Sequence, residues 1–219
     1  MPESPSESRH CTVCRQPGLR HLLTVRAVPY WRCPTCEATL MDPTCWLDAV
    51  AEKQVYDLHH NDPSDPGYRR FLAKLTDPLI ERLPSGARGL EFGCGPGPAL
   101  ATMLTEQGFA MTLFDPYYHP NQAVLESRYQ FVTCTEVIEH LHDPWSTFAQ
   151  FDQLLEPGGW LGIMTCFQTD DARFANWHYR RDPTHVVFYR ESTLAHIARR
   201  FDWTLHIPVK DVALFQKPL

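Results

Sequence analysis

Four cysteines near the N-terminus constrain the fold of this chain more than any other feature. They form two Cys-x2-Cys pairs, Cys11 with Cys14 and Cys33 with Cys36. Each short pair can place two sulfur atoms on one tetrahedral ion, so the spacing predicts a small zinc ribbon with four thiolate ligands. Two disulfides or four reduced thiols are the alternatives. Disulfides are rare in the cytosol, and the polar N-terminal segment has no apolar stretch typical of a secretory signal. We therefore expect zinc, bound by a cytoplasmic protein.

The length and charge of the chain limit its class. At about 150 residues per domain, 219 residues allow one catalytic-sized domain and a small appendage. The net charge of −6 gives no overall attraction to nucleic acid or to an anionic membrane. No apolar run approaches the roughly 20 residues that span a bilayer. We expect neither DNA nor a membrane as a partner.

From residue 88 onward the hydrophobic pattern alternates between strands and helices. This alternation predicts a doubly wound α/β domain, with a mostly parallel sheet covered by helices on both faces. Ligands of such sheets bind beyond the carboxyl ends of the strands. The predicted organisation is a flexible tail, a zinc ribbon, a connector and the α/β domain, over residues 1–10, 11–42, 43–67 and 68–219 respectively.

The strongest signal in the α/β domain is a glycine-rich turn that follows a strand and opens a helix, with Gly93, Gly95 and Gly97. Glycines let the backbone turn tightly and approach a ligand. The fingerprint of dinucleotide-binding proteins would require glycine at the position of Pro98, which weakens that interpretation. An acidic side chain just before the turn, Glu91, suits a ligand with a positive amino group. Asp115 ends the second strand, where a carboxylate can bind both hydroxyls of a ribose.

With these residues the chain resembles the class I S-adenosylmethionine-dependent methyltransferases over about residues 68–219. The resemblance rests on the glycine-rich turn, on Asp115 and on two further stretches, Thr135-Glu-Val-Ile-Glu-His-Leu141 and Leu154-Leu-Glu-Pro-Gly-Gly159. It implies S-adenosylmethionine as the cofactor and a seven-stranded Rossmann-like sheet whose last strand is antiparallel. Only residues 116–130 separate the second strand from the next one, so we expect a shortened third-strand region.

The resemblance also implies which residues hold the cofactor. Glu91 would face the methionine amino group, and Asp115 would face the ribose. The further cofactor-binding residues implied by the matching motifs are Gly93, Cys94, Gly95, Gly97, Thr135 and Glu136.

Three histidines, His140, His178 and His185, lie on segments expected to rim the pocket. Methyl transfer depends on positioning the acceptor in line with the methyl group, and a base helps when the acceptor is a hydroxyl or an amine. These histidines are therefore the candidate catalytic residues. The long connection over residues 168–185 predicts a substrate lid, with an aromatic-rich surface loop as the alternative.

Glu136, Glu139 and His140 share one face of a predicted helical turn. The stretch is similar to the Glu-x-x-Glu-His segment of ubiquinone-pathway O-methyltransferases and small-RNA 2′-O-methyltransferases, where it binds a metal. This resemblance implies a second divalent-cation site for Mg²⁺, with His185 as a fourth ligand. We favour the alternative, in which the stretch binds no metal and His140 caps or lines the pocket.

The ribbon segment suggests a different substrate. Between residues 9 and 36 there is no acidic residue, but there are five arginines: Arg9, Arg15, Arg20, Arg26 and Arg32. Such a basic ribbon can hold RNA phosphates. Because the net charge opposes RNA elsewhere, we favour a small-molecule acceptor, with a hydroxyl as the methylated group. RNA methylation is the alternative, and a non-catalytic interaction protein on a methyltransferase fold is the second alternative, against which Glu91 and Asp115 argue.

Overall fold

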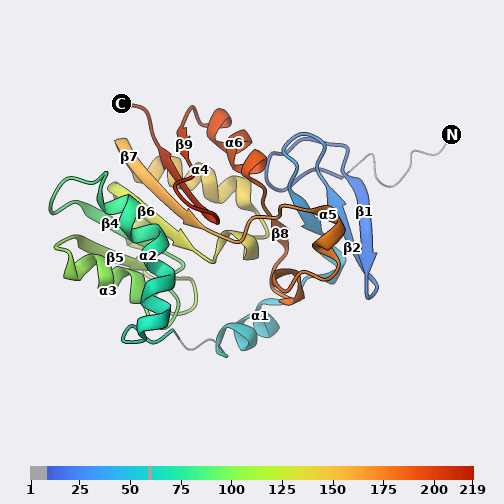
Figure 1. Cartoon of the computed structure of the whole chain (residues 1–219), viewed down its shortest axis with the longest axis horizontal. Coiled ribbons are helices and arrows are strands. Elements are labelled where there is room, and N and C mark those ends of the chain that lie inside the picture. Colours follow the sequence, from blue (N-terminus) through green and yellow to red (C-terminus); the bar gives the residue numbers. More distant parts are fainter. Residues whose placement is uncertain (1–8, 59–60) are drawn as a thin grey trace.

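The computed structural model describes residues 9–58 and 61–219, which form two β-sheets and the helices around them. Figure 1 shows the larger sheet beside the N-terminal ribbon. Most of the predicted tail lies outside the described residues. Within them, His10 already forms a β-bridge with Pro17. No described helix is long and apolar enough to cross a membrane.

The large sheet has six strands. β4, β5, β6 and β7 run parallel to their neighbours, while β10 is antiparallel to both β7 and β9. This arrangement confirms the predicted doubly wound α/β class and the antiparallel last strand. In spatial order the strands are β5 (Ala110–Phe114), β4 (Arg88–Phe92), β6 (Tyr129–Thr135), β7 (Leu155–Met164), β10 (Val212–Gln216) and β9 (Thr204–His206).

The expectation of seven strands is wrong. Within the described residues the large sheet has six strands. After β5 the chain forms one isolated bridge between Asp115 and His119 and a short 3-10 helix, η2 (Gln122–Glu126), before it enters β6. A further parallel strand would need a crossover of about ten residues on each side, and residues 116–128 are too few for that. The shortened third-strand region therefore contains no strand, and β5 is an edge of the sheet.

Two helices cover each face of the large sheet. Adjacent residues of β6 point to opposite faces, so Phe131 packs in the core below α2 and α3, and Val132 packs in the core below α4. A proline inside a helix, such as Pro78 in α2, often kinks or breaks it. The helix α2 instead continues through Pro78 to Ile80, because the proline lies in its last turn and disturbs few further bonds. The helices are α2 (Pro66–Ile80), α3 (Ala99–Glu106), α4 (Pro144–Leu154) and α6 (Glu191–Arg200).

The ribbon forms a second sheet, and its fourth strand comes from the α/β domain. The hairpin between β1 and β2 turns at Arg26 and Ala27, which both have positive φ as tight hairpin turns require. Neighbouring strands are antiparallel. In spatial order they are β1 (Arg20–Val25), β2 (Val28–Arg32), β3 (Thr39–Met41) and β8 (Val187–Phe188). The ribbon is therefore built into the α/β domain and shares a hydrophobic core with α4 and α6.

The connector contains one helix, α1 (Ala49–Tyr56), whose first turn is capped by the Asp48 carboxylate. In Figure 1 this helix lies apart from both sheets, at the lower side of the view. The remaining short helices are η1 (Pro43–Cys45), η3 (Ile138–His140), α5 (Asp171–Phe174) and η4 (Tyr179–Arg181).

Candidate active site and metal centre

A cavity of about 650 Å³ opens where β4, β5 and β6 end. This volume is within the usual range of small-molecule sites, about 300–1,000 Å³. Its walls are the glycine-rich turn, the residues after β5, the residues after β6 and the inner face of α1. The cavity therefore lies at the carboxyl edge of the parallel sheet, where the sequence predicts a ligand.

The glycine-rich turn packs tightly against the opposite walls. Gly93 has a φ of 77°, and a Cβ atom there would lie 2.5 Å from a methyl carbon of Val137. A Cβ atom on Gly97 would lie 2.0 Å from the carbonyl oxygen of Asn61. Only glycine fits at these two positions. The predicted cofactor residues Glu91, Gly93, Cys94, Gly95, Asp115, Thr135 and Glu136 line the cavity, whereas Gly97 faces Asn61 instead.

Glu91 and Asp115 occupy the ends of adjacent strands. Glu91 is 6% exposed and accepts a hydrogen bond from the Ala101 amide at the start of α3. Burial raises the pKa of Glu91 to about 8. The Asp115 carboxylate accepts bonds from the amides of Gly95, Tyr117 and Tyr118, which fix its orientation. Oδ1 of Asp115 already accepts two of these bonds, whereas Oδ2 of Asp115 and both oxygens of Glu91 keep a free lone pair. Glu91 can therefore accept from an amino group, and Asp115 from a ribose hydroxyl.

His140 and His185 lie together in the cavity, with their ring centroids 4.6 Å apart. The His140 Nδ1 atom is 3.2 Å from the Thr184 carbonyl oxygen, and the His185 Nδ1 atom is 2.7 Å from the Tyr179 carbonyl oxygen. A carbonyl only accepts, so both Nδ1 atoms carry hydrogen, and the Nε2 atom of a neutral ring then has a free lone pair. Burial lowers the pKa of His140 to about 4, which keeps the ring neutral.

His178 is placed differently from the other two predicted histidines. Its side chain is exposed and does not line the cavity. It precedes η4, whose neighbouring ring, Tyr179, turns inward. A role of His178 in the chemistry of this cavity has no support from the geometry.

Only three of the four predicted ligands of the second cation site come together. One ligand atom from each of Glu139, His140 and His185 lies within 4.8 Å of the others, and Glu136 is not part of this set. Glu139 already accepts hydrogen bonds from the hydroxyls of Tyr179 and Thr165. Mg²⁺ prefers an octahedron of oxygen ligands, which two imidazoles and one occupied carboxylate do not supply. The predicted Mg²⁺ is therefore not supported.

Glu136, which is half-buried, and Glu139, which is fully buried, instead form an acidic pair. The Tyr179 hydroxyl donates to Glu139 Oε1 at 2.6 Å and lies 3.2 Å from Glu136 Oε2. Burial, together with the charge of Glu139, raises the pKa of Glu136 to about 9. Glu136 is therefore mostly protonated at neutral pH.

The connector supplies cavity residues that the sequence analysis missed. Tyr56 on α1 packs its ring edge-on against His140, with centroids 5.3 Å apart, and 5.8 Å from the ring of Tyr117. Glu52, one turn earlier on α1, also lines the cavity. Their spacing of four residues indicates a shared helix face, but no pattern in the sequence indicates where that face docks.

The predicted lid packs mainly on the ribbon. Phe174 is fully buried, with its ring centroid 5.0 Å from those of Tyr30 and Phe188. Of residues 168–185, only Asp182 and His185 line the cavity. The aromatic side chains of this loop therefore hold the ribbon in place.

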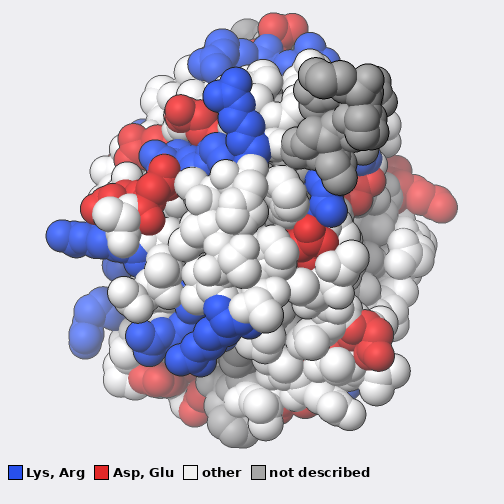
Figure 2. Space-filling view, turned by 90° about the vertical axis from the view of Figure 1, so that its right-hand side faces the viewer, with Lys and Arg blue, Asp and Glu red and all other residues white. Residues whose placement is uncertain are grey.

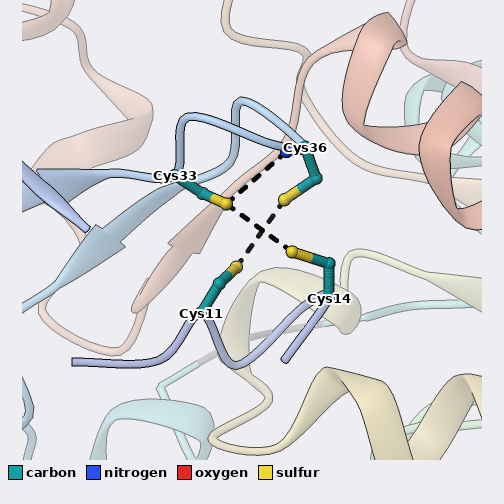
Figure 3. Close-up of side chains that lie close together, drawn as sticks. All are labelled: Cys11, Cys14, Cys33 and Cys36. Carbon is teal, nitrogen blue, oxygen red and sulfur yellow. Dashed lines mark hydrogen bonds between the residues drawn. The ribbon is translucent and has the colours of Figure 1, made fainter. Parts of the chain in front are cut away.

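The four ribbon cysteines converge on one point from two loops (Figure 3). The Sγ atoms of Cys11 and Cys36 are 3.6 Å apart, as are those of Cys14 and Cys33. A disulfide would require about 2.05 Å. Zn–S bonds of about 2.3 Å in a tetrahedron place the sulfurs roughly 3.8 Å apart. The buried cluster therefore fits a four-thiolate zinc ion and excludes disulfides among these residues.

Three of the five ribbon arginines form ion pairs. Arg9 pairs with Asp42, Arg15 with Asp143, and Arg32 with Asp171. Within the described residues, no carboxylate pairs with the other two. In Figure 2, which shows the ribbon side, Lys and Arg lie in separate groups next to Asp and Glu. This pairing reduces the positive charge available to RNA phosphates. The unpaired arginines are Arg20 and Arg26.

Comparison with known protein families finds a match to the model of a methyltransferase domain over residues 64–206. Curated relatives include ubiquinone biosynthesis O-methyltransferases from Citrobacter koseri and Escherichia coli (strain K12 / DH10B). Each is 30% identical over 138 residues, which cover 52% of this chain. The chain spans about half the length of these relatives, 52% and 53%.

Solved structures with the same fold include an N1-methyltransferase of 1,6-didemethyltoxoflavin from Burkholderia thailandensis, determined with S-adenosylhomocysteine. It has a TM-score of 0.51 and 19% identity, and covers 92% of this chain and 99% of its own. The N-methyltransferase NodS from Bradyrhizobium japonicum, also with S-adenosylhomocysteine, has a TM-score of 0.50 and 16% identity, and covers 78% of this chain and 100% of its own. At these identities the similarity concerns the fold alone.

Proposed function

The chain belongs to the methyltransferase family, and on that basis we propose that it transfers a methyl group from S-adenosylmethionine to a hydroxyl of a small-molecule acceptor. One observation carries the cofactor assignment. Glu91 and Asp115 lie at the ends of adjacent parallel strands, on either side of a glycine-rich turn, and both line one cavity. This arrangement offers a carboxylate to an amino group and another to a ribose.

The proposed chemistry uses His140, the neutral member of the histidine pair. S-adenosylmethionine supplies a methyl group bonded to a positively charged sulfur. The acceptor hydroxyl would bind near His140, whose free Nε2 lone pair can take the hydroxyl proton while the new O–C bond forms and the C–S bond breaks. Glu139 Oε1 lies 3.9 Å from His140 Nε2 and would stabilise the imidazolium. Tyr56 and the rest of α1 cover this part of the cavity and limit access of water.

The zinc ion has a structural role in this proposal. Cys11, Cys14, Cys33 and Cys36 would fill all four positions of a tetrahedral ion, which leaves none for a substrate. The ion would hold the two loops of the ribbon together, a segment whose own core is small.

A small-molecule acceptor has more support than RNA. The curated relatives are named for ubiquinone biosynthesis, although the chain spans only about half of them. Three ribbon arginines are already paired with carboxylates. No observation specifically favours RNA or a non-catalytic interaction protein.

Calorimetry with S-adenosylhomocysteine tests the cofactor assignment. We expect micromolar or tighter binding, and a loss of about 1.5–3 kcal/mol in Asp115→Ala, as for the loss of hydrogen bonds to a charged group. Asp48→Ala is the matched control, because this carboxylate caps α1 away from the glycine-rich turn. Stronger binding of a nicotinamide dinucleotide than of S-adenosylhomocysteine would refute the proposal.

A further inference from the structure

The cavity has an unusual distribution of charge. Among the described residues, its lining contains five carboxyl groups and three imidazoles, but no lysine or arginine. Glu91 and Asp115 belong to the cofactor end, beside the glycine-rich turn. Glu136 is partnered by Tyr179. Two carboxylates remain without a role in the proposed function, Glu52 and Asp182.

Glu52 and Asp182 line the same cavity as the histidine pair. Glu52 precedes Tyr56 by one turn of α1, and the ring of Tyr56 packs against His140. The Asp182 Oδ2 atom is 3.9 Å from His185 Nε2. Both carboxylates therefore face the part of the cavity in which the acceptor would bind.

Glu52 is buried without a hydrogen-bond donor. The residue is 8% exposed, and its Oε1 atom has no hydrogen-bond partner among the described residues. The His142 Nε2 atom is 3.0 Å away, but its orientation does not make a hydrogen bond. The His142 ring is stacked flat on Trp46, with centroids 4.3 Å apart, which restrains it from turning toward Glu52. A buried carboxylate in this state loses hydration without compensation.

Asp182, unlike Glu52, accepts hydrogen bonds within the protein. Although burial acts to raise its pKa, two hydrogen bonds from Thr184 to its Oδ1 atom lower the pKa below the ordinary value. The second oxygen, Oδ2, faces His185. Asp182 therefore contributes a fixed negative charge beside His185.

We propose that the acceptor carries a protonated amine and that Glu52 binds this group, so that the enzyme selects cationic hydroxyl compounds over anionic ones. The proposal rests on the proposed function and adds a substrate class to it. An ammonium group would supply the donor that Glu52 lacks, and the bond would be charge-assisted in a poorly hydrated site. An acceptor with a carboxylate or a phosphate would meet Glu52 and Asp182 with no lysine or arginine to offset them. The same repulsion disfavours RNA.

Three matched probes test this inference. Dopamine, 4-ethylcatechol and 3,4-dihydroxyphenylacetate share two phenolic hydroxyls and differ in the charge of the side chain. Their dissociation constants are measured by calorimetry on the full chain saturated with S-adenosylhomocysteine. We expect dopamine to bind at least about tenfold more tightly than 4-ethylcatechol, the scale of one hydrogen bond between charged groups, and the carboxylate probe to bind most weakly.

Variants of the full chain separate the possible origins of the preference. Glu52→Gln should bring dopamine and 4-ethylcatechol to within about twofold, while Glu52→Asp retains the charge and part of the preference. His142→Gln should leave the preference in place, which distinguishes recognition by Glu52 from a local pair with His142. Glu126→Gln, an exposed change on η2, is the control and should alter nothing.

The outcomes are decisive in each case. Equal binding of the three probes, binding of none, or a preference that survives in Glu52→Gln overturns the inference. Weaker S-adenosylhomocysteine binding by Glu52→Gln also overturns it, since Glu52 would then contact the cofactor. If Glu52→Gln does not fold, the wild type and the folded Glu52→Asp variant are tested instead. Absence of the preference for dopamine in both proteins overturns the inference. A wild-type protein that binds no S-adenosylhomocysteine contradicts the proposed function itself, before any probe is added.

Discussion

Glu91 and Asp115 end two neighbouring strands, but the protein holds the two carboxyl groups in different environments. Asp115 accepts three backbone amide hydrogen bonds, whereas Glu91 accepts one and is almost fully buried. Burial raises the pKa of Glu91 to about 8, so this group is mostly protonated at pH 7 when no ligand is bound.

This protonation predicts a pH-dependent cofactor affinity. An ammonium group beside Glu91 favours the ionised carboxylate and lowers its pKa, so binding at pH 7 should release up to one proton. The release should shrink as the pH rises past 8, where Glu91 is already ionised. The number of protons released is measured by calorimetric titration with S-adenosylhomocysteine in two buffers that differ in ionisation enthalpy. Glu91→Gln should bind more weakly and release no proton; an unchanged release in this variant would contradict the role of Glu91.

His140 is the residue whose loss should affect chemistry without affecting the cofactor. General-base catalysis contributes about 10²–10⁴-fold, so His140→Gln should lower kcat for a phenolic probe by that range and leave S-adenosylhomocysteine affinity unchanged. Because the pKa of His140 is lowered to about 4, the rate should not fall until the pH drops below about 5. His178→Gln is the matched control, because His178 is exposed outside the cavity. Equal losses in the two variants would remove His140 from the mechanism.

At the residue scale, sequence patterns predicted the residues fixed by local structure. Glu91, Gly93 and Asp115 follow directly from strand ends and a tight turn, and they line the cavity as expected. Glu52 and Tyr56 could not be predicted, because periodicity identifies the face of a helix but not the surface on which that face docks.

At the scale of elements, β8 connects the ribbon to the candidate active site. The Met41 amide donates to the Val186 carbonyl, and the Val186 amide donates to the Glu139 carbonyl. His185 precedes Val186 directly. A single residue thus joins the ribbon strand β3 to the turn that carries Glu139 and His140.

This connection predicts the effect of metal removal. Elemental analysis should find about one zinc per chain, as a four-thiolate site requires. Chelation of the zinc, or Cys33→Ser, should increase amide hydrogen exchange in residues 39–41 and 184–189 as well as in the cysteine loops. S-adenosylhomocysteine affinity should change by no more than about threefold, because the glycine-rich turn follows β4, which belongs to the other sheet. Increased exchange confined to the cysteine loops would show that the ribbon does not support the active site.

Strands with a clear hydrophobic period were predictable, and β8 was not. The alternation of strands and helices predicted from residue 88 onward appears in β4 to β7 and their helices, and the last strand, β10, is antiparallel as the resemblance implies. β8 has two residues and pairs with a ribbon strand distant in the sequence. Such a short segment has no period, so only its tertiary partner makes it a strand.

At the scale of the whole molecule, the ribbon and the α/β domain share one core. Tyr30 of the ribbon packs against Phe174 and Phe188, and the ribbon cysteines belong to the same hydrophobic cluster as α4 and α6. The cofactor end of the cavity lies on the strands, while the acceptor end lies between α1 and residues 182–185. The ribbon contacts the segment that forms the acceptor end through the pairing of β3 with β8.

The central claim is that Glu91 and Asp115 hold S-adenosylmethionine in the cavity beside the histidine pair. A crystal structure of the protein with S-adenosylhomocysteine tests this most directly. We expect the ribose hydroxyls within about 3 Å of the Asp115 carboxylate, the amino group beside Glu91, and the sulfur facing His140 and Tyr56. A ligand bound outside this cavity, or one whose ribose lies away from Asp115, would contradict the account.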